Sequence, residues 1–342
     1  MNCISNALRV AAVFLCIIML FIYGLYSLFL RPQEVNPSVD YENVFAPVLT
    51  DNPKEKENNN VSAVSAEEKK TAVATAGGEA LGKIIKRTIK SGSATSSSNG
   101  VHLNNSTGLK VNVSSLLKGK LGYTIKKNKK PQVLIVHTHA TESFLSEDRD
   151  YYTASDKSRT TDNSFNVTAL GEIVADKLNS SGIKTLHDTT QHDYPSYNQS
   201  YSRAAKTITG YLDKYPSIKV VIDIHRDSVQ SGSTKTKLTA EIDGKTAAQV
   251  MLVMGSQSGN VKNFPKWKEN LKLALKFQKN IEETYPYLAR PLSLMSRSYN
   301  ERLTTGSMLL EIGTEANSFD EAKYSAELIS NSLIKTLEST DK

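Results

Sequence analysis

Cysteine is almost absent from this chain: among 342 residues, only Cys3 and Cys16 carry a thiol. Everything after residue 16 therefore lacks the means to form a disulfide bond or to bind a metal through sulfur. The sequence also lacks a glycine-rich phosphate-binding loop, a serine-centred nucleophile turn and any internal repeat of useful length. These absences exclude cysteine-ligated zinc sites, P-loop nucleotide binding and hydrolysis by a serine at such a turn.

Charge is absent from residues 10–30, a run of 21 that as a helix would span about 30 Å, the thickness of the hydrocarbon layer of a bilayer. A cleaved signal peptide usually has a hydrophobic region of about 7 to 15 residues and a small-residue cleavage site, and neither is present. We therefore expect an uncleaved transmembrane anchor, with residues 1–9 as a cytoplasmic tail and the long domain outside. Arg9 and Arg31 flank the run on opposite sides, so charge gives little help with its orientation.

Apolar residues are sparse after the anchor, where Asn, Ser, Lys, Glu, Ala and Gly dominate. Such a composition buries too little apolar surface to offset chain entropy, so residues 31–107 are predicted to be a disordered linker. Residues 79–89 interrupt it and favour a transient amphipathic helix. One folded catalytic domain is expected over residues 108–342. The net charge of +7 includes a lysine-rich stretch before the first strong strand, typical of a solvated connector or of a segment attracted to anionic polymers or lipid headgroups.

Strand and helix patterns alternate through the folded domain, which is typical of a mostly parallel sheet flanked by helices. Apolar, β-branched runs predict strands at residues 132–136, 183–186, 217–224 and 307–312. Helical periodicity predicts helices at residues 165–179, 201–215, 267–285 and 319–337. Asp243-Gly244, between residues 237–242 and 248–254, indicates a two-strand hairpin. The predicted fold class is α/β.

Polar residues follow or interrupt three of the predicted strands. His137 and His139 come after the first, His225 follows the buried run at 217–224, and Glu311 lies within the last. Ligands of open α/β sheets bind at the carboxyl ends of strands, so we expect these side chains at one edge of the sheet. A charged Glu311 inside an apolar strand would be costly without a partner, which favours a functional role.

His139, Glu142 and His225 together offer two imidazoles and one carboxylate, a ligand set that lets a catalytic zinc keep its fourth position open. The short spacing from His139 to Glu142 allows both to come from one turn, while His225 arrives from a distant strand. We predict that these three residues bind Zn²⁺, which would polarise a substrate carbonyl. Glu311 is predicted to act as general base and then as general acid.

Other residues compete for these roles, because a single His after a strand is usually a packing residue and His-x-x-Glu also occurs by chance. His187 and His192 are expected to pack or to contact the substrate. Alternative assignments are His137 in place of His139, Asp162 in place of Glu142 and Glu315 in place of Glu311. If His137 is not a ligand, we expect it to support the ligands or to face the substrate. Further candidates, for binding peptide carboxylates, are Arg226, Arg297 and Arg302.

Four separated motifs closely resemble the stage II sporulation protein P family: VLIVHTHATESF (133–144), HDTTQHDYPSYNQSY (187–201), VIDIHRD (221–227) and LLEIGTEAN (309–317). The resemblance runs from about residue 108 to the C-terminus. It implies a fold and zinc chemistry similar to those of the zinc N-acetylmuramoyl-L-alanine amidases. It also implies a hydrolase that strips stem peptides from peptidoglycan and has an additional endopeptidase activity. In these amidases a zinc-binding His ends one strand and a later strand carries a Glu before a Gly, which His225 and Glu311 match.

Two ligands match that pattern less well. The Gly-His-Gly-Gly loop of the amidases is absent here, and their glutamate ligand lies near the position of Asp162. His139 and Glu142 instead resemble the His-x-x-Glu of zinc carboxypeptidases. The choice between His137 and His139, and that between Glu142 and Asp162, therefore stay open.

The resemblance further implies a setting and partners. The implied setting is an endospore-forming bacterium, in which the protein is anchored in the mother-cell membrane and faces the forespore. The implied partners are stage II sporulation proteins D and M, with which it would act on peptidoglycan during engulfment. A long linker would let an anchored domain reach nearby wall. We expect no nucleic-acid partner. Alternative hypotheses are a non-catalytic wall-binding module that recruits other hydrolases and a metallocarboxypeptidase that trims stem peptides.

Overall fold

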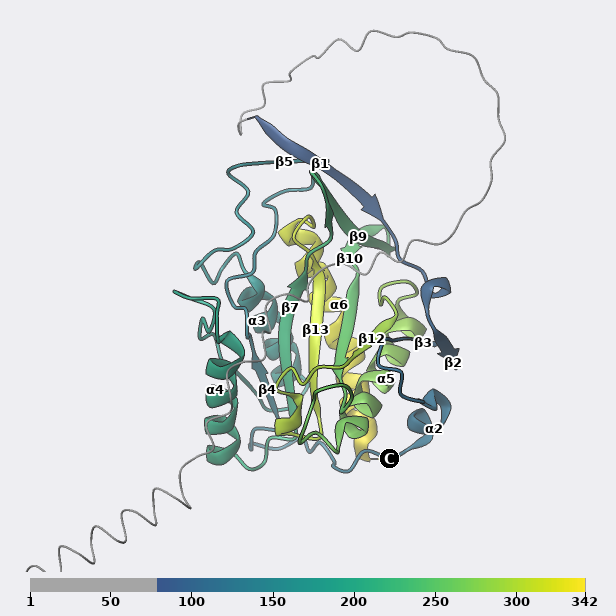
Figure 1. The fold of residues 1–342 in the computed structure, drawn as a ribbon. Coiled ribbons are helices and arrows are strands. Elements are labelled where there is room, and N and C mark those ends of the chain that lie inside the picture. Colours follow the sequence, from purple (N-terminus) through teal and green to yellow (C-terminus); the bar gives the residue numbers. More distant parts are fainter. Residues whose placement is uncertain (1–78, 342) are drawn as a thin grey trace, which may run out of the picture. The chain divides into compact units, whose positions relative to one another are not determined.

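Two β-sheets organise the computed structural model, which describes residues 79–341 (Figure 1). The larger sheet has eight strands in the order β2-β3-β12-β11-β13-β7-β4-β6. In chain order these are β2 Ser96–Ser98, β3 Val101–Asn105, β4 Val133–Val136, β6 Thr185–His187, β7 Val220–Asp227, β11 Val250–Gly255, β12 Leu292–Met295 and β13 Ser307–Thr314. The pairs β2–β3 and β11–β13 are antiparallel and the other neighbours are parallel. The predicted α/β class is confirmed, and the sheet is mixed.

Helices cover both faces of the central strands. The helices α3 (Val167–Ser180), α5 (Trp267–Thr284) and α6 (Phe319–Glu338) contribute to the larger core, and α4 (Ser200–Lys214) packs on the opposite face. Alternate residues of β4 serve the two faces: Val133 and Ile135 join the larger core, whereas Leu134 and Val136 pack with Ile208 of α4. Because both faces of β4 are buried, this strand is apolar throughout, which made it recognisable in the sequence.

The four helices predicted from periodicity begin and end within two residues of the predicted bounds. Side-chain caps explain two of the starts. The Asn166 side chain accepts from the backbone N–H of Thr168 at the start of α3, and Ser318 and Glu321 form a capping box at the start of α6. A further short helix, α2 (Val113–Lys118), was not predicted.

The smaller sheet has the order β10-β9-β1-β5, with β8 paired to β9. Its strands are β1 Ala80–Arg87, β5 Tyr151–Thr153, β8 Gln230–Ser231, β9 Thr234–Ile242 and β10 Lys245–Ala248. The prediction of a helix at residues 79–89 is wrong, because this segment forms β1. The linker boundary at residue 107 and the domain start at 108 are also corrected, since β1, β2 and β3 precede them. The sequence did not reveal β1 because its partners, β5 and β9, lie far along the chain.

The hairpin around Asp243 and Gly244 is present, with φ angles of 51° and 74° that suit a tight two-residue turn. It joins β9 to the short β10, whereas the rest of its predicted second arm is β11 and belongs to the larger sheet. Within residues 79–341 no helix is long and apolar enough to cross a membrane. The predicted tail, the anchor at residues 10–30 and the linker as far as residue 78 lie outside the described residues.

Candidate active site

The site lies where β4, β7 and β13, which are parallel neighbours, end at one edge of the larger sheet. Glu311 of β13 is directly opposite His225 of β7, and Val136, the last residue of β4, is opposite Asp223. Directly opposite residues on neighbouring strands share a face of the sheet. The structure therefore places His225 and Glu311 together, and the turn after β4 adds His139 and Glu142.

His139 is only 2% exposed, and its ring centroid is 5.2 Å from that of His225. Tyr197 stacks on the His139 ring at 4.5 Å, and Tyr201 lies edge-on at 5.6 Å. Neither ring nitrogen of His139 has a hydrogen-bond partner. Burial lowers the pKa of His139 to about 3, so its imidazole is neutral at pH 7 and free to act as a ligand through nitrogen.

His225 lies between two carboxylates. Its Nδ1 is 3.5 Å from Oε2 of Glu142, and its Nε2 is 2.9 Å from Oδ1 of Asp223. The contact with Asp223 brings opposite charges together but lacks the angle of a hydrogen bond, so Nε2 has no hydrogen-bond partner. Burial opposes a charged ring, yet Asp223 and Glu142 together raise the pKa of His225 well above its ordinary value.

Glu142 is buried at the start of the long loop between β4 and α3. Its Oε2 accepts a hydrogen bond of 3.0 Å from the backbone N–H of Arg226, and its Oε1 is 3.7 Å from a guanidinium nitrogen of Arg159. Burial alone would raise the pKa of this carboxyl group, but His225 and Arg226 hold it well below its usual range. Glu142 is therefore an ionised carboxylate next to His225.

Asp223 is a member of the site that the sequence reasoning missed. The backbone N–H and the hydroxyl of Thr138 donate to it at 2.8 and 2.6 Å. It therefore connects the turn after β4 to His225 on β7. The signal was available, because residues two apart on a strand share a face, and Asp223 is two residues before His225.

Glu311 is 2% exposed, and its Oε2 has no hydrogen-bond partner. Burial raises its pKa to about 8, and the nearby Asp227 carboxylate adds to the shift. A second buried carboxyl group, that of Glu301, accepts a hydrogen bond of 2.9 Å from the backbone N–H of Gly255, and burial raises its pKa well above the ordinary value. Sequence reasoning did not single out Glu301.

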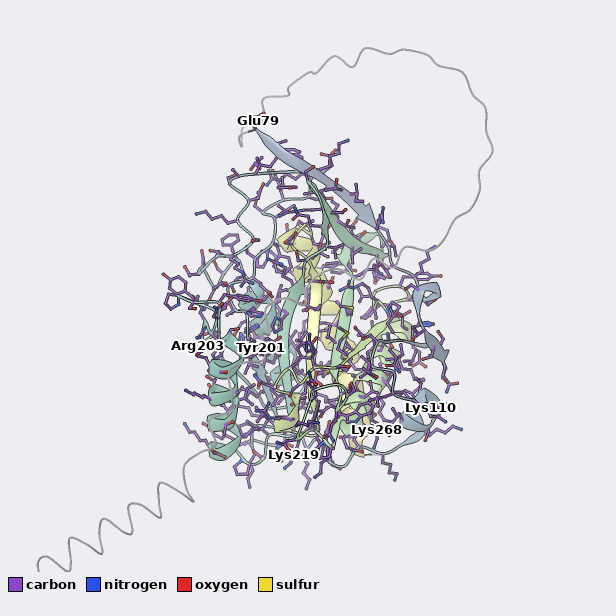
Figure 2. The ribbon with its side chains drawn as sticks, viewed as in Figure 1. Glu79, Lys110, Tyr201, Arg203, Lys219 and Lys268 are labelled. Atoms are coloured by element: carbon purple, nitrogen blue, oxygen red, sulfur yellow. The ribbon has the colours of Figure 1, made fainter. Side chains whose placement is uncertain are left out.

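Two tyrosines that the sequence reasoning also missed border the site. Tyr201, near the start of α4 (Figure 2), lies with its ring 6.2 Å from that of Tyr299. Tyr299 and Asn300 both have positive φ angles, of 46° and 60°, and Asn300 donates to the backbone carbonyl of Tyr201 at 2.8 Å. Backbone strain in consecutive residues is concentrated at functional sites in many proteins, and here it fixes the segment that carries Tyr299.

His137 has partners different from those of His139. Its Nδ1 donates to the backbone carbonyl of Ile224 at 3.0 Å, and its Nε2 is 2.9 Å from Nε2 of His187. His187 in turn contacts Glu172 through Nδ1 at 2.7 Å. Because both of its nitrogens are engaged, His137 is less suited than His139 to bind a metal.

The remaining candidates lie as follows. Arg226 is buried and donates to the backbone carbonyls of Ser143 and Ser158, so its guanidinium holds the loop. Asp162 is exposed and accepts from Ser164 in a local turn. The other candidates form no hydrogen bond or ion pair with His139, Glu142, His225 or Glu311. Arg302 is exposed and Arg297 is half-buried. His192 is hydrogen-bonded to the backbone carbonyl of His137, and Glu315 accepts a hydrogen bond from Ser228.

Donor type and burial of these side chains suit Zn²⁺. Both nitrogens of His139 are buried without hydrogen bonds, and the carboxylate of Glu142 lies 3.5 Å from Nδ1 of His225, whose Nε2 faces Asp223. Buried polar atoms without partners are costly, so an unpaired set of this kind favours a ligand. As the side chains stand, however, residues 79–341 contain no group of three or more His, Cys, Asp or Glu side chains arranged to hold a metal ion.

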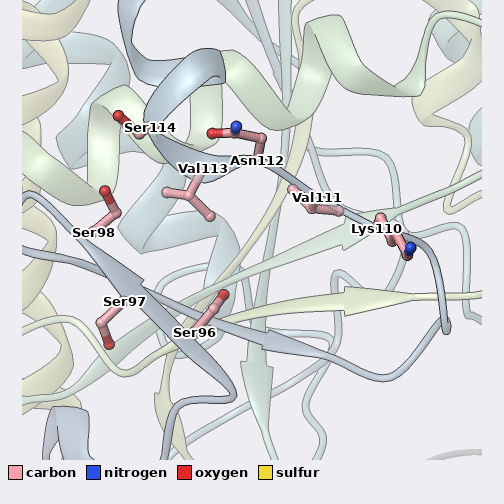
Figure 3. A pocket seen from close by; sticks show the side chains of 8 residues that line it. All are labelled: Ser96, Ser97, Ser98, Lys110, Val111, Asn112, Val113 and Ser114. Carbon is pink, nitrogen blue, oxygen red and sulfur yellow. The ribbon is translucent and has the colours of Figure 1, made fainter.

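A surface hollow of about 420 Å³ lies elsewhere, between β2 and the segment before α2 (Figure 3). Its lining is Ser96, Ser97, Ser98, Lys110, Val111, Asn112, Val113 and Ser114. It contains no acid, histidine or cysteine, and we assign it no part in the chemistry of the site.

Residues 34–334 match the model of a protein family that is described as stage II sporulation protein P. A curated protein of that description from Bacillus subtilis (strain 168) is 31% identical over 208 residues, which cover 58% of this chain and 49% of the relative. The match thus spans about half the length of that relative.

Two solved structures show a weaker likeness. The N-acetylmuramyl-L-alanine amidase Ami1 of Mycobacterium abscessus is 10% identical, with a TM-score of 0.37, over 62% of this chain and 100% of that one. The CwlD amidase of Clostridioides difficile, solved in complex with the GerS lipoprotein, is 13% identical, with a TM-score of 0.37, over 61% of this chain and 98% of that one. Likeness at this level assigns no activity.

Proposed function

Because this chain belongs to the stage II sporulation protein P family, we propose that it is a peptidoglycan hydrolase that acts during sporulation. The proposed activity is that of a zinc-dependent N-acetylmuramoyl-L-alanine amidase with additional endopeptidase activity. The observation that carries this proposal is the convergence of two buried imidazole rings, those of His139 and His225, and two buried carboxyl groups, those of Glu142 and Glu311, at one edge of the sheet. Amide hydrolysis needs such a combination of electrophile binding and proton transfer.

His139, Glu142 and His225 would hold the metal. Zinc bound there would supply a Lewis acid that polarises the carbonyl of the amide to be cleaved. Asp223 and the backbone N–H of Arg226 orient the ligands: Asp223 lies against His225, and Arg226 donates to Glu142. Partners of this kind fix the rings and raise their basicity as ligands.

Glu311 would move the proton. Its position opposite His225 and its unpartnered Oε2 would leave its ionised form, which a cation bound nearby favours, free to accept a proton from the attacking water and to deliver that proton to the leaving nitrogen. Burial of the surrounding residues excludes bulk water, which strengthens each polar interaction in the site.

We further propose that residues 10–30 anchor the protein in the mother-cell membrane, with the catalytic domain outside the cytoplasm and facing the forespore. The uncharged run of 21 residues supports the anchor. Stage II sporulation proteins D and M are the proposed partners in engulfment, on the basis of family resemblance.

The test is hydrolysis of purified peptidoglycan by the full chain in detergent. Mass spectrometry of the products should show free stem peptides, and zinc chelation should abolish their release. Glu311→Gln should lower the rate by about 10² to 10⁴-fold, the usual contribution of a general acid-base group. Glu338→Gln is the matched control, since Glu338 is exposed at the end of α6 and pairs with Lys127.

Each alternative function predicts a different product. A metallocarboxypeptidase would leave shortened peptides on the sugar, and a recruitment module would bind wall without releasing any peptide. Unchanged release by Glu311→Gln, or in the presence of the chelator, would contradict the mechanism.

A further inference from the structure

Strand β1 connects two parts of the chain that otherwise do not pair. It lies in the smaller sheet between β9, to which it is parallel, and β5, to which it is antiparallel (Figure 1). Within residues 79–341, β5 has no strand partner except β1. The backbone N–H of Ile84 also donates to the carbonyl of Asp150, next to β5, at 2.6 Å.

The strand β5 is the middle of the loop that carries Glu142. This loop leaves the end of β4, reaches the smaller sheet at β5 and returns to α3. Its two arms are joined near the site: Glu142 forms a β-bridge with Arg159, and the backbone N–H of Thr160 donates to the carbonyl of Thr141 at 2.7 Å. β1 therefore supplies the strand pairing that holds the far end of the loop, and the ion pair between Asp148 and Lys237 of β9 adds to it.

A small apolar cluster reinforces this connection. Ile84 of β1, Tyr152 of β5, Leu145 and Ala316 pack together and are all buried. Leu145 is three residues after Glu142, so the cluster joins β1 to the segment that carries the proposed ligand. The ammonium group of Lys235, on β9, lies over the Tyr152 ring, 4.5 Å from its centroid.

Gly82 makes the close approach of these strands possible. A Cβ atom at this position would lie 1.9 Å from the backbone carbonyl oxygen of Ser233 and 2.7 Å from the Tyr152 ring. Ordinary contacts of this kind are at least about 3.4 Å, so a side chain at this position must shift β1 away from the turn at Ser233, which leads into β9, and away from the Tyr152 ring of β5. The Ser233 oxygen already accepts from the N–H of Lys83 and from the hydroxyl of Tyr152, at 3.1 and 3.2 Å.

We propose that β1 positions the catalytic loop, and that Gly82 is the positioning residue that lets it do so. The proposal rests on the function proposed above and deepens it, because it makes a strand outside the motifs necessary for the placement of Glu142. β1 lies within the stretch predicted to be a linker, residues 31–107, so the end of that stretch is itself part of the structure that places the ligand.

The experiment compares Gly82→Ala with Gly92→Ala in the full chain, purified in detergent. Gly92 follows β1 in the same segment, and a Cβ there would meet no atom within 4 Å. A displacement near 1 Å at a catalytic group lowers rates by up to about 10²-fold. We expect Gly82→Ala to reduce kcat on a soluble peptidoglycan fragment at least about tenfold. KM and all values for Gly92→Ala should stay near those of the unchanged chain.

Hydrogen exchange gives a readout that does not depend on hydrolysis. In Gly82→Ala, amides of residues 146–157 should exchange faster, whereas those of β13 and α6 should keep their protection. Faster exchange throughout the chain would mean general destabilisation and would overturn the proposal. Unchanged exchange in residues 146–157 would overturn it as well.

A disulfide provides the rescue. Lys83 and Tyr151 are directly opposite across the β1–β5 pair, a separation that a disulfide can span. With Cys3 and Cys16 replaced by serine, Lys83→Cys and Tyr151→Cys are added to Gly82→Ala. Oxidation should restore at least half of the lost kcat, and reduction should remove it again. Thiol titration shows whether the disulfide has formed. If it has formed and activity is not restored, the positioning role is refuted.

The two proposals fail in different ways. If the unchanged chain releases no peptide, the proposed function fails, and hydrogen exchange still decides whether β1 holds the loop. If the unchanged chain is active and Gly82→Ala equals Gly92→Ala in kcat and in exchange, only the role of β1 fails.

Discussion

Gly171 in α3 allows the helix to pack directly on the His137–His187 pair. A Cβ at this position would lie 2.6 Å from Nε2 of both histidines. These two nitrogens are themselves 2.9 Å apart and share a hydrogen bond. We therefore predict that Gly171→Ala destabilises the protein, although alanine is the better helix former.

The size of the effect follows from opposing contributions. Replacing glycine by alanine inside a helix stabilises it by about 1 kcal/mol. Overpacking a buried site costs about 1–3 kcal/mol, and leaving a buried hydrogen-bonding group unpaired costs about 1–3 kcal/mol more. The net expected loss of unfolding free energy is about 1–5 kcal/mol. Gly210 in α4, where a Cβ would meet nothing within 4 Å, is the control, and Gly210→Ala should gain about 0.5–1 kcal/mol.

Fluorescence of Trp267, the single tryptophan of the chain and 6% exposed, reports unfolding in urea. Each variant is compared with the unchanged chain under the same conditions and in the same detergent. Equal shifts of the midpoint for Gly171→Ala and Gly210→Ala would refute the reasoning, because they would show that α3 accommodates the extra methyl group without disturbing the histidines.

Two further predictions concern buried carboxyl groups. Asp223→Asn removes the charge beside His225, so zinc affinity and hydrolysis should each fall about 10- to 100-fold, measured by metal titration and by peptide release. Normal values for both would contradict the orienting role of Asp223. The pKa of Glu301 is raised by burial, so above the ordinary carboxyl pKa the unfolded chain loses this proton first, and unfolding free energy falls as pH rises. The unfolding free energy of Glu301→Gln, measured in urea, should therefore rise relative to that of the unchanged chain as pH increases from 4.5 to 8. If the difference between the two chains stays constant over that range, the prediction is wrong.

The central strands and long helices could be predicted because the residues of each segment show by themselves which positions are buried. β4 lies between two layers of helices, and β7 and β13 are buried along almost their whole length, so most positions along the three strands are apolar until the site begins. The helices have one buried face, and their periodicity marks both ends. Alternating elements of this kind lead to an α/β sheet whose strand ends meet at one edge, which brought His225 and Glu311 together.

The smaller sheet could not be predicted, because its stability comes from pairing between distant segments. β1 has only two residues of low exposure at its centre, and a short apolar run of this kind fits a helix or a strand equally well. β5 has three residues, and its partner β1 precedes it by more than sixty positions. Gly82 would count against a helix and equally against a strand by propensity, although the contacts with Ser233 and Tyr152 require it.

The contrast between His137 and His139 shows where sequence pattern stops being informative. If β4 continued through both residues, they would share a face, and nothing in the spacing would separate them. The strand ends at Val136, however, and the turn that follows leaves His137 bonded to Ile224 and His187 while His139 lies beside His225 with both nitrogens unpaired. The end of the strand depends on tertiary contacts, among them the two hydrogen bonds from Thr138 to Asp223. The same contacts that hold Asp223 against His225 therefore also decide which histidine is available to a metal.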